Sequence, residues 1–452
     1  MRLIAYMKPY AHWVIFAILL VLGLTAFDLY RPMLVGDAID TFGANGDYDV
    51  IIATAIKYAV VLALSFAFNV AQTWILQKTG QNIILQMRKD LYRHIQSLGS
   101  RYFDITPVGK LVTRVTNDVE ALNEMYSGIL VQLFRNIVKI VGLAGVMLVL
   151  DVRLAAISFV LMPLVIGLTV LCQKIARNIY RLYRTRLTDI NTFLSEHLSG
   201  MKIIQIFGRQ ERKFEEFHDK NTKLYKAFYR EMLMYAVFRP LIYILSILSL
   251  MIVLWFGSKN VFDEIISVGT LYIFSNYIRS FFDPIQELAE QFSTLQSSIA
   301  SAEKIFTVMD EDEFIPEVEN PKQPDKITGK IEFDHVWFAY DGENYVLKDV
   351  SFVINPGEKV AFVGATGAGK SSILNLIGRY YDIQKGHIYI DGIDIRQLSK
   401  KQLRSAIGQM QQDVFIFEGD VAYNIRLNDD DITDAQVRAA AEYVNASHFI
   451  EK

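Results

Sequence analysis

A glycine-rich stretch of this 452-residue chain has the composition of a phosphate-binding loop. It reads Gly364-Ala365-Thr366-Gly367-Ala368-Gly369-Lys370-Ser371, which fits the pattern G-x-x-x-x-G-K-[ST]. The apolar residues 360–363 before it predict a buried strand, and residues 372–377 after it predict the start of a helix. Glycines let the backbone curl so that several N–H groups point at one phosphate, and a helix N-terminus adds positive potential. The sequence therefore predicts a nucleoside triphosphate site.

The polar side chains in and near the loop have distinct expected roles. Lys370 is expected to reach between the β- and γ-phosphates, and the Ser371 hydroxyl is expected to bind Mg²⁺. Tyr340, about 24 residues before the loop, has the position of a ring that could stack on adenine. Gln412 lies in a polar run after the loop and could supply an amide oxygen to Mg²⁺. From spacing alone, Tyr340 is more often a packing residue, and the signal at Gln412 is weak as well.

The elements around the loop predict a soluble α/β domain. Strand-like runs at residues 330–338, 350–354, 359–363 and 386–390 alternate with turns and a helix. A charged, proline-punctuated stretch, residues 309–329, precedes them and predicts a linker. We therefore expect a domain at residues 330–452 and a different one at residues 1–308.

The first 308 residues carry the apolar character of the chain, of which 52% is hydrophobic and 12% aromatic. Six segments are long enough to cross about 30 Å of hydrocarbon: residues 12–35, 51–76, 129–150, 154–172, 236–256 and 268–288. The last is the most polar, because it contains Asn276, Arg279 and Asp283. The sequence thus predicts an all-α, six-helix membrane domain.

Charge sets the expected orientation. The segment between the first two spans has four aspartates and no Lys or Arg, whereas the long segments after spans two and four are rich in both. Basic segments stay on the cytoplasmic side, so both termini and the triphosphate site are expected there. Both basic segments have helical periodicity, which predicts membrane helices that continue into the cytoplasm and turn near residues 104–109 and near Gly208.

Several side chains inside the predicted spans are charged, which makes them candidates for contact with a transported molecule. Arg279 is the first candidate, while Asp28 with Arg31, and Arg279 with Asp283, could instead form local pairs. Arg135 and Lys139 could reach the cytoplasmic interface. The single cysteine, Cys172, excludes an internal disulfide. A net charge of −3 argues against a general nucleic-acid binder.

Taken together, the chain resembles the half-transporters of the ABC exporter family, in which six membrane helices are fused to a nucleotide-binding domain. Tyr340 matches the family's adenine-stacking position, residues 364–372 match its phosphate loop with Ser372 where Thr is common, and Gln412 matches its Q-loop glutamine. Residues 103–118 and 199–208 are similar to its two cytoplasmic tips, and residues 301–306 resemble the end of its sixth helix. The resemblance implies ATP and Mg²⁺ as cofactors.

Four further motifs of the family should follow Gln412: the Leu-Ser-Gly-Gly-Gln signature, the Walker B strand with its catalytic Glu, the D-loop and the switch His. None occurs before Lys452, so no catalytic residue is assigned and the nucleotide-binding domain is expected to be partial. In the family a second half-transporter donates the signature to each ATP. We therefore expect the 452 residues alone to bind ATP weakly and to hydrolyse it poorly.

The resemblance implies ATP-driven alternating access in a bacterial plasma membrane, with lipid around the helices. Drug-like or lipid-like amphipathic molecules are the expected cargo, in line with the aromatic residues of spans one and six. The alternatives are a non-catalytic, ATP-binding partner in a heterodimer and a peptide exporter; no N-terminal peptidase domain is present to favour the latter.

Overall fold

The computed structural model describes residues 2–46, 48–324, 326–410, 414–427, 429 and 431–451. Contacts divide the chain into two compact units. The first consists of Met1–Leu98 and Tyr102–Glu313, and the second of Gly99–Arg101 and Phe314–Lys452.

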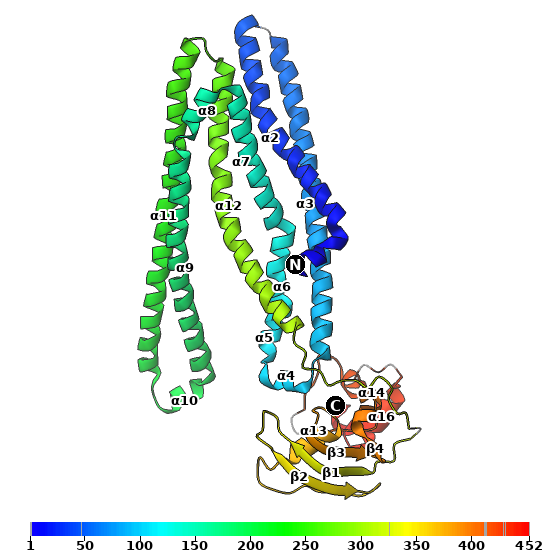
Figure 1. Cartoon of the computed structure of the whole chain (residues 1–452). Helices are drawn as coiled ribbons and strands as arrows, with labels where there is room; N and C mark the ends of the chain where they lie inside the picture. Colours follow the sequence, from blue (N-terminus) through cyan, green and yellow to red (C-terminus); the bar gives the residue numbers. More distant parts are fainter. Residues whose placement is uncertain are drawn as a thin grey trace. The chain divides into compact units, whose positions relative to one another are not determined.

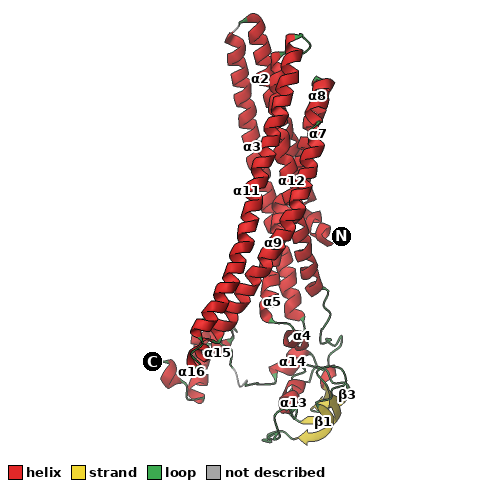
Figure 2. Ribbon diagram, turned by 90° about the vertical axis from the view of Figure 1, so that its left-hand side faces the viewer, coloured by secondary structure: helices red, strands yellow, loops and turns green. Residues whose placement is uncertain are grey.

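The first unit is entirely helical in its described part and is built of long helices that run side by side (Figures 1 and 2). In chain order, the helices are α1 (Arg2–Met7), η1 (Lys8–Tyr10), α2 (Ala11–Asn45), α3 (Tyr48–Ser97), α4 (Ser100–Ile105), α5 (Val108–Thr113), η2 (Arg114–Asp118), α6 (Val119–Glu124), η3 (Met125–Ile129), α7 (Leu130–Leu150), α8 (Val152–Phe159), α9 (Met162–Ser199), α10 (Met201–Ile206), α11 (Gln210–Phe262) and α12 (Val268–Met309). The segments η2 and η3 are π-helical turns within the long helix that runs from α5 to α7.

In the described part of the chain, five helical stretches are long and apolar enough to cross a membrane: Arg2–Gly43, Tyr48–Ser97, Val108–Leu150, Val152–Ser199 and Gln210–Phe262. They contain the first five predicted spans. The sixth predicted span lies in α12, a continuous helix of 42 residues. Its charged residues keep its hydropathy below that of the other five, as its sequence indicates.

The fourth predicted span is interrupted, which corrects the expectation of one helix through residues 154–172. A turn at residues 160–161 separates α8 from α9. Pro163 lies in the first turn of α9, where it needs no N–H partner. Within a continuous helix its ring would clash with the carbonyl of Phe159, so the chain breaks there instead.

The two turns expected near residues 104–109 and near Gly208 occur where the sequence predicts them. After α3 and the short helix α4, Pro107 forms the N-cap of α5. Gly208, with φ at +59°, follows the short helix α10 and precedes α11. The membrane helices therefore continue well beyond an apolar span, because α3, α9, α11 and α12 each contain 38 to 53 residues.

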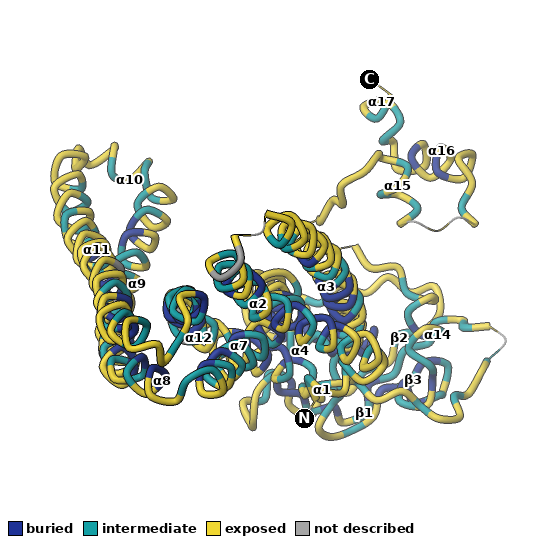
Figure 3. Tube along the Cα trace, turned by 90° about the horizontal axis from the view of Figure 1, so that it is seen from above, coloured by how far each residue is buried: buried dark blue, intermediate teal, exposed yellow. Residues whose placement is uncertain are grey.

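Two larger apolar clusters, together with a smaller one that joins α2, α3 and α7 around Val21, hold the described helices of this unit together. One joins α7, α8, α9, α11 and α12 around Phe274, Tyr277 and Leu154. The other joins α3, α6, η3 and the far end of α12 around Met87, Leu122 and Ile305. The outward faces of α3, α9 and α11 remain exposed (Figure 3), and many of their exposed side chains are large and apolar. Such faces suit contact with lipid.

The second unit contains a four-stranded sheet in the order β2-β1-β3-β4, with every neighbouring pair antiparallel. The strands are β1 (Ile331–Phe338), β2 (Leu347–Ile354), β3 (Lys385–Ile390) and β4 (Ile393–Asp394). The helices are α13 (Lys370–Ile377), η4 (Ile395–Gln397), α14 (Lys400–Ser405), α15 (Val421–Arg426), α16 (Asp434–Tyr443) and α17 (Ser447–Ile450). Phe333, Ile388 and Leu376 form the centre of a core that packs α13 against the sheet.

The predicted strand at residues 359–363 is wrong. These residues are irregular, and Val363 is 91% exposed rather than buried. A strand needs a neighbour for its N–H and C=O groups, and none of the described strands pairs with this segment. The apolar run therefore leads into the loop as irregular chain that pairs with none of the described strands.

Candidate nucleotide-binding site

Two glycines with positive φ shape the loop that begins at Gly364. Gly367 has φ +87° and Gly369 has φ +83°. The amide of Ala368 donates to the carbonyl of Ala365 at 3.1 Å, which closes a tight turn. Gly369 is buried, and a Cβ there would lie 2.6 Å from Leu347 Cδ2. Only glycine meets both conditions without strain.

Lys370 and Ser371 open α13 directly after this turn. The Lys370 ammonium donates to the carbonyls of Gly364 at 2.9 Å and Ala365 at 2.8 Å, so it lies across the mouth of the loop. Ser371 is exposed in the first turn of the helix. No side chain of the described residues caps this N-terminus, which leaves its first N–H groups available to an anion. The geometry thus suits a phosphate with an ammonium beside it.

Tyr340 lies beside the same helix. Its hydroxyl donates to Ser372 Oγ at 3.0 Å, and its ring meets those of Phe338 and Tyr381 edge to face, at centroid distances of 4.7 and 5.1 Å. Ser372 is buried, so its side chain is engaged in this contact and only its backbone N–H could serve a phosphate. The structure therefore brings Tyr340 and the loop together, while Gln412 lies outside the described residues.

Gln384 is a residue that the sequence analysis did not identify. Its side-chain carbonyl accepts from the Ala339 amide at 2.9 Å, and its side-chain amide donates to the Ala339 carbonyl at 3.0 Å. This double hydrogen bond fixes the backbone next to Tyr340. Because Gln384 lies 45 positions after Ala339, no local sequence pattern predicts this contact.

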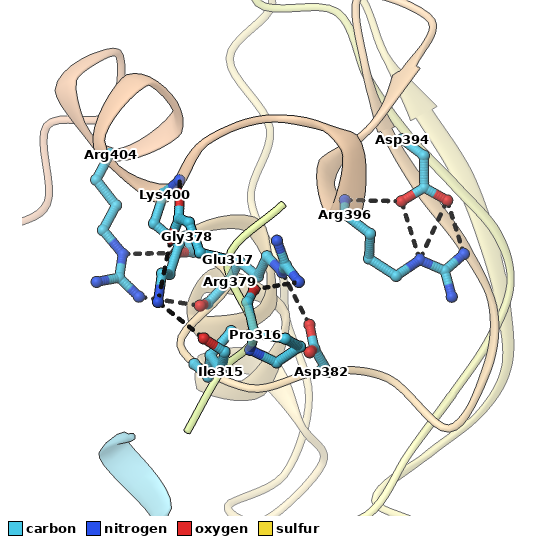
Figure 4. Close-up of polar contacts among 10 residues, drawn as sticks. All are labelled: Ile315, Pro316, Glu317, Gly378, Arg379, Asp382, Asp394, Arg396, Lys400 and Arg404. Atoms are coloured by element: carbon cyan, nitrogen blue, oxygen red, sulfur yellow. Dashed lines mark hydrogen bonds and ion pairs between the residues drawn. The ribbon is translucent and has the colours of Figure 1, made fainter. Parts of the chain in front are cut away.

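The other end of α13 is held by arginines (Figure 4). Arg404 of α14 donates to the carbonyls of Gly378 at 3.2 Å and Arg379 at 3.0 Å, which satisfies groups at the helix C-terminus. Arg379 is almost fully buried and donates to Asp382 at 2.9 Å and to the Pro316 carbonyl at 3.2 Å. Hydrogen bonds from these arginines therefore hold the C-terminal end of α13, opposite the phosphate loop.

The predicted linker is bound to the second unit over part of its length. Lys400 Nζ donates to the Ile315 carbonyl at 2.8 Å and lies 3.1 Å from Glu317 Oε2. Burial works against ionisation of Glu317, but hydrogen bonds from Lys400 outweigh it and lower the Glu317 pKa. Asp391 likewise binds residues 328–330 through their amides and the Thr328 hydroxyl.

Comparisons with known proteins agree with this arrangement. A family model described as "ABC transporter transmembrane region" matches residues 14–285, and one described as "ABC transporter" matches residues 347–452. The chain belongs to the ABC transporter family. It combines the membrane region and the ATPase region in one polypeptide, which is the half-transporter arrangement.

Several bacterial ABC transporters resemble most or all of the chain. The protein exp8 of Streptococcus pneumoniae, named as an ABC transporter ATP-binding protein, is 35% identical over 100% of this chain and 77% of its own length. An ATP-dependent lipid A-core flippase of Desulfotalea psychrophila is 30% identical over 97% of this chain and 76% of its own length. A fatty acid ABC transporter ATP-binding/permease protein of Mycobacterium bovis is 34% identical over 87% of this chain and 62% of its own length.

The charged residues of the ABC transporter membrane helices fall into two groups. Asp28 of α2 pairs with Arg31, as its spacing predicts, and also with Arg135 of α7 at 3.4 Å. Arg279 and Asp283 of α12 are both exposed, and no ion pair joins them in the described part of the chain. Asp283 instead lines a cavity with Arg135 and Lys139.

Proposed function

We propose that this chain is a subunit of an ATP-driven exporter that moves amphipathic, drug-like or lipid-like molecules across a membrane by alternating access. Family membership supports the ATP-driven transport. Relatives named for fatty acid and lipid A-core substrates support an amphipathic cargo. The observation that carries the proposal is a curled phosphate loop in the same chain as five strongly apolar helices and a sixth long one.

The proposed nucleotide site consists of the loop residues, the start of α13 and two flanking side chains. Its members are Tyr340, Gly364, Ala365, Thr366, Gly367, Ala368, Gly369, Lys370, Ser371, Ser372 and Gln412. Lys370 would exchange its two loop carbonyls for phosphate oxygens, and Tyr340 would offer the free part of its ring to adenine.

Mg²⁺ fits the same site. The ion keeps several waters and takes one or two protein oxygens together with phosphate oxygens, and the exposed Ser371 hydroxyl offers such a ligand. Gln412 is the second proposed ligand. When bound, Mg²⁺ would neutralise charge on the β- and γ-phosphates.

The proposed organisation places the membrane domain at residues 1–308, the linker at 309–329 and the nucleotide-binding domain at 330–452. Basic segments and bacterial relatives support a bacterial plasma membrane location with the nucleotide-binding domain and the N-terminus in the cytoplasm. The proposed partner is a second half-transporter, which would donate its signature motif to the ATP held here.

The test reconstitutes the chain with its partner in liposomes and measures ATP-dependent movement of fluorescent lipids and drugs. Lys370→Met should reduce ATP binding at least tenfold, because it removes a charge-assisted contact, whereas Lys401→Met, an exposed control on α14, should not. EDTA should weaken binding to the unmodified chain. If ATP binding survives Lys370→Met unchanged, or if no amphipathic molecule moves with ATP, the proposed function is wrong.

A further inference from the structure

A cavity of about 570 Å³ lies between α7 and α12, which run side by side (Figure 1). From α7 it is lined by Gln132, Arg135, Asn136 and Lys139. Positions 132, 135 and 139, and likewise 132, 136 and 139, are three or four residues apart, so the four side chains share one face of the helix. A polar face on a helix that otherwise carries membrane-type apolar residues is costly, and it points to a function.

The facing wall is acidic. From α12, the cavity is lined by Asp283, Glu287, Glu290 and Gln291. They too recur at helical spacing on one face. The two walls therefore differ in sign: the cationic side chains lie on α7 and the carboxylates lie on α12.

Hydrogen bonds fix one side of this cavity. Asn136 is only 5% exposed, and its amide donates to Glu287 Oε2 at 2.9 Å and to Gln291 Oε1 at 3.4 Å. Gln291 in turn donates to Gln132 at 3.0 Å. A buried, partnered amide holds its neighbours in place, so these contacts fix the positions of Glu287, Gln291 and Gln132 at this side of the cavity.

Other charges in the cavity remain available to a ligand. Lys139 and Asp283 form no ion pair with any described residue. Arg135 shares the single carboxylate of Asp28 with Arg31, so this trio keeps one net positive charge. Because these opposite charges do not pair with each other, a ligand that carries both a negative and a positive group could pair with both.

The cavity also borders apolar surroundings. Along α7 and α12, one apolar cluster extends to Leu133 and Leu295, and the other includes Ile140 and Phe282. The charged residues of the cavity lie between these two apolar clusters. A ligand with apolar chains could thus leave its chains against the apolar helices and place only its head in the cavity.

We propose that this cavity binds the zwitterionic head of an amphipathic substrate, with its anionic group at Arg135 and Lys139 and its amine at Asp283 and Glu287. The proposal rests on the proposed export function and narrows its substrate class. A purely anionic head would face three carboxylates, and a purely cationic head would face Lys139 and the net positive trio. A zwitterion satisfies both walls.

The test compares three probes with equal chains on the full chain in detergent, by isothermal titration calorimetry. The probes are dihexanoyl phosphatidylethanolamine, the anionic dihexanoyl phosphatidylglycerol and a cationic dihexanoyl trimethylammonium lipid. The zwitterion should bind about tenfold more tightly than either of the others, as expected for one additional charge-assisted contact.

Two variants test the cationic wall on α7 and the acidic wall on α12 separately. Lys139→Met should weaken the zwitterionic and anionic probes about tenfold and spare the cationic one, while Glu287→Gln should weaken the zwitterionic and cationic probes and spare the anionic one. Lys57→Met on α3 and Glu303→Gln on α12 are exposed controls outside the cavity and should change nothing.

Equal binding of the three probes, or tighter binding of the anionic one, would overturn the proposal, and this ranking needs no variant to fold. Variants that weaken all three probes alike would also contradict it, since that pattern indicates a structural role. ATP-driven movement of other amphipathic molecules, measured on the same protein, tells the two proposals apart. If that ATP-driven movement persists while the probes contradict the binding prediction, the proposed zwitterion site is wrong and the proposed export function stands.

Discussion

At the scale of single residues, the phosphate loop depends on two glycines whose surroundings differ. Both have positive φ, but Gly367 faces open space whereas Gly369 packs against Leu347. A side chain at Gly367 would meet only the backbone penalty of the left-handed region, about 1–2 kcal/mol. At Gly369 a clash is added to that penalty.

We therefore expect Gly369→Ala to destabilise the second unit more than Gly367→Ala, by about 1 kcal/mol or more. The measurement is hydrogen exchange of residues 364–377 without nucleotide, so that contacts with phosphate do not enter the comparison. A larger loss of protection in Gly367→Ala would show that the packing around Gly369 has been misassigned.

Asp394 contributes stability that depends on pH. Its burial works against ionisation, but hydrogen bonds from Arg396 and His387 outweigh that cost and lower the Asp394 pKa from 3.8 to about 2. A lowered carboxyl pKa stabilises the fold above the unfolded pKa. That contribution, about 2 kcal/mol, is lost as the pH falls from 4 towards 2.

Asp394→Asn should remove this dependence. We expect β3 to lose about 1–2 kcal/mol of protection at neutral pH and to become insensitive to acid between pH 4 and pH 2. Hydrogen exchange of residues 385–394, corrected for intrinsic rates, measures both effects. Glu343→Gln, an exposed charge-to-amide change in the same unit, is the control. Equal acid sensitivity in Asp394→Asn and the unmodified chain would refute the assignment.

At the scale of elements, α2 and α12 cross with almost no space between their backbones. A Cβ at Gly269 would lie 2.1 Å from the Gly36 carbonyl oxygen, and the Gly269 amide donates to Asp40 at 2.7 Å. Asp40 therefore satisfies a free N–H in the first turn of α12. At this crossing α2 and α12 meet through close backbone contact and through the Asp40 side chain.

Gly269→Ala should separate these helices and lower the thermal stability of the first unit by about 1–3 kcal/mol, the usual cost of overpacking. Gly145→Ala is the matched control, since no atom lies within 4 Å of its added Cβ. Thermal unfolding in detergent compares the two variants. Similar melting temperatures would mean that the crossing relaxes without cost.

The limits of sequence-based prediction are also visible among the elements. The runs at residues 330–338, 350–354 and 386–390 form strands because they pair with one another. The equally apolar residues 360–363 do not, because a strand depends on a partner that its own sequence cannot reveal. Gln384 and Arg379 were missed for a related reason: their roles arise from contacts with residues 45 and 63 positions away.

At the scale of the whole molecule, transport requires that nucleotide-driven motion reach the membrane helices. The two tips, near residues 104–110 and 206–212, are the proposed points of contact with nucleotide-binding domains. The second tip carries exposed apolar side chains, which suit such a contact. Ile203 and Ile206 of α10 and the adjacent Phe207 are 63%, 69% and 72% exposed, although this short helix belongs to no predicted span.

Apolar side chains outside the membrane gain stability when a partner covers them, and an aromatic anchor often carries much of the binding energy. Phe207→Ser should therefore reduce ATP-driven transport about tenfold while ATP binding is retained, because the nucleotide site is untouched and only the transmission is weakened. Phe214→Ser is the control, with the same substitution at a 61% exposed position outside the tip. A proline inserted at residues 206–212 should uncouple ATP hydrolysis from transport completely. If both serine variants transport equally, the exposed apolar tip has no part in coupling, and the contact must be sought elsewhere on the helical extensions.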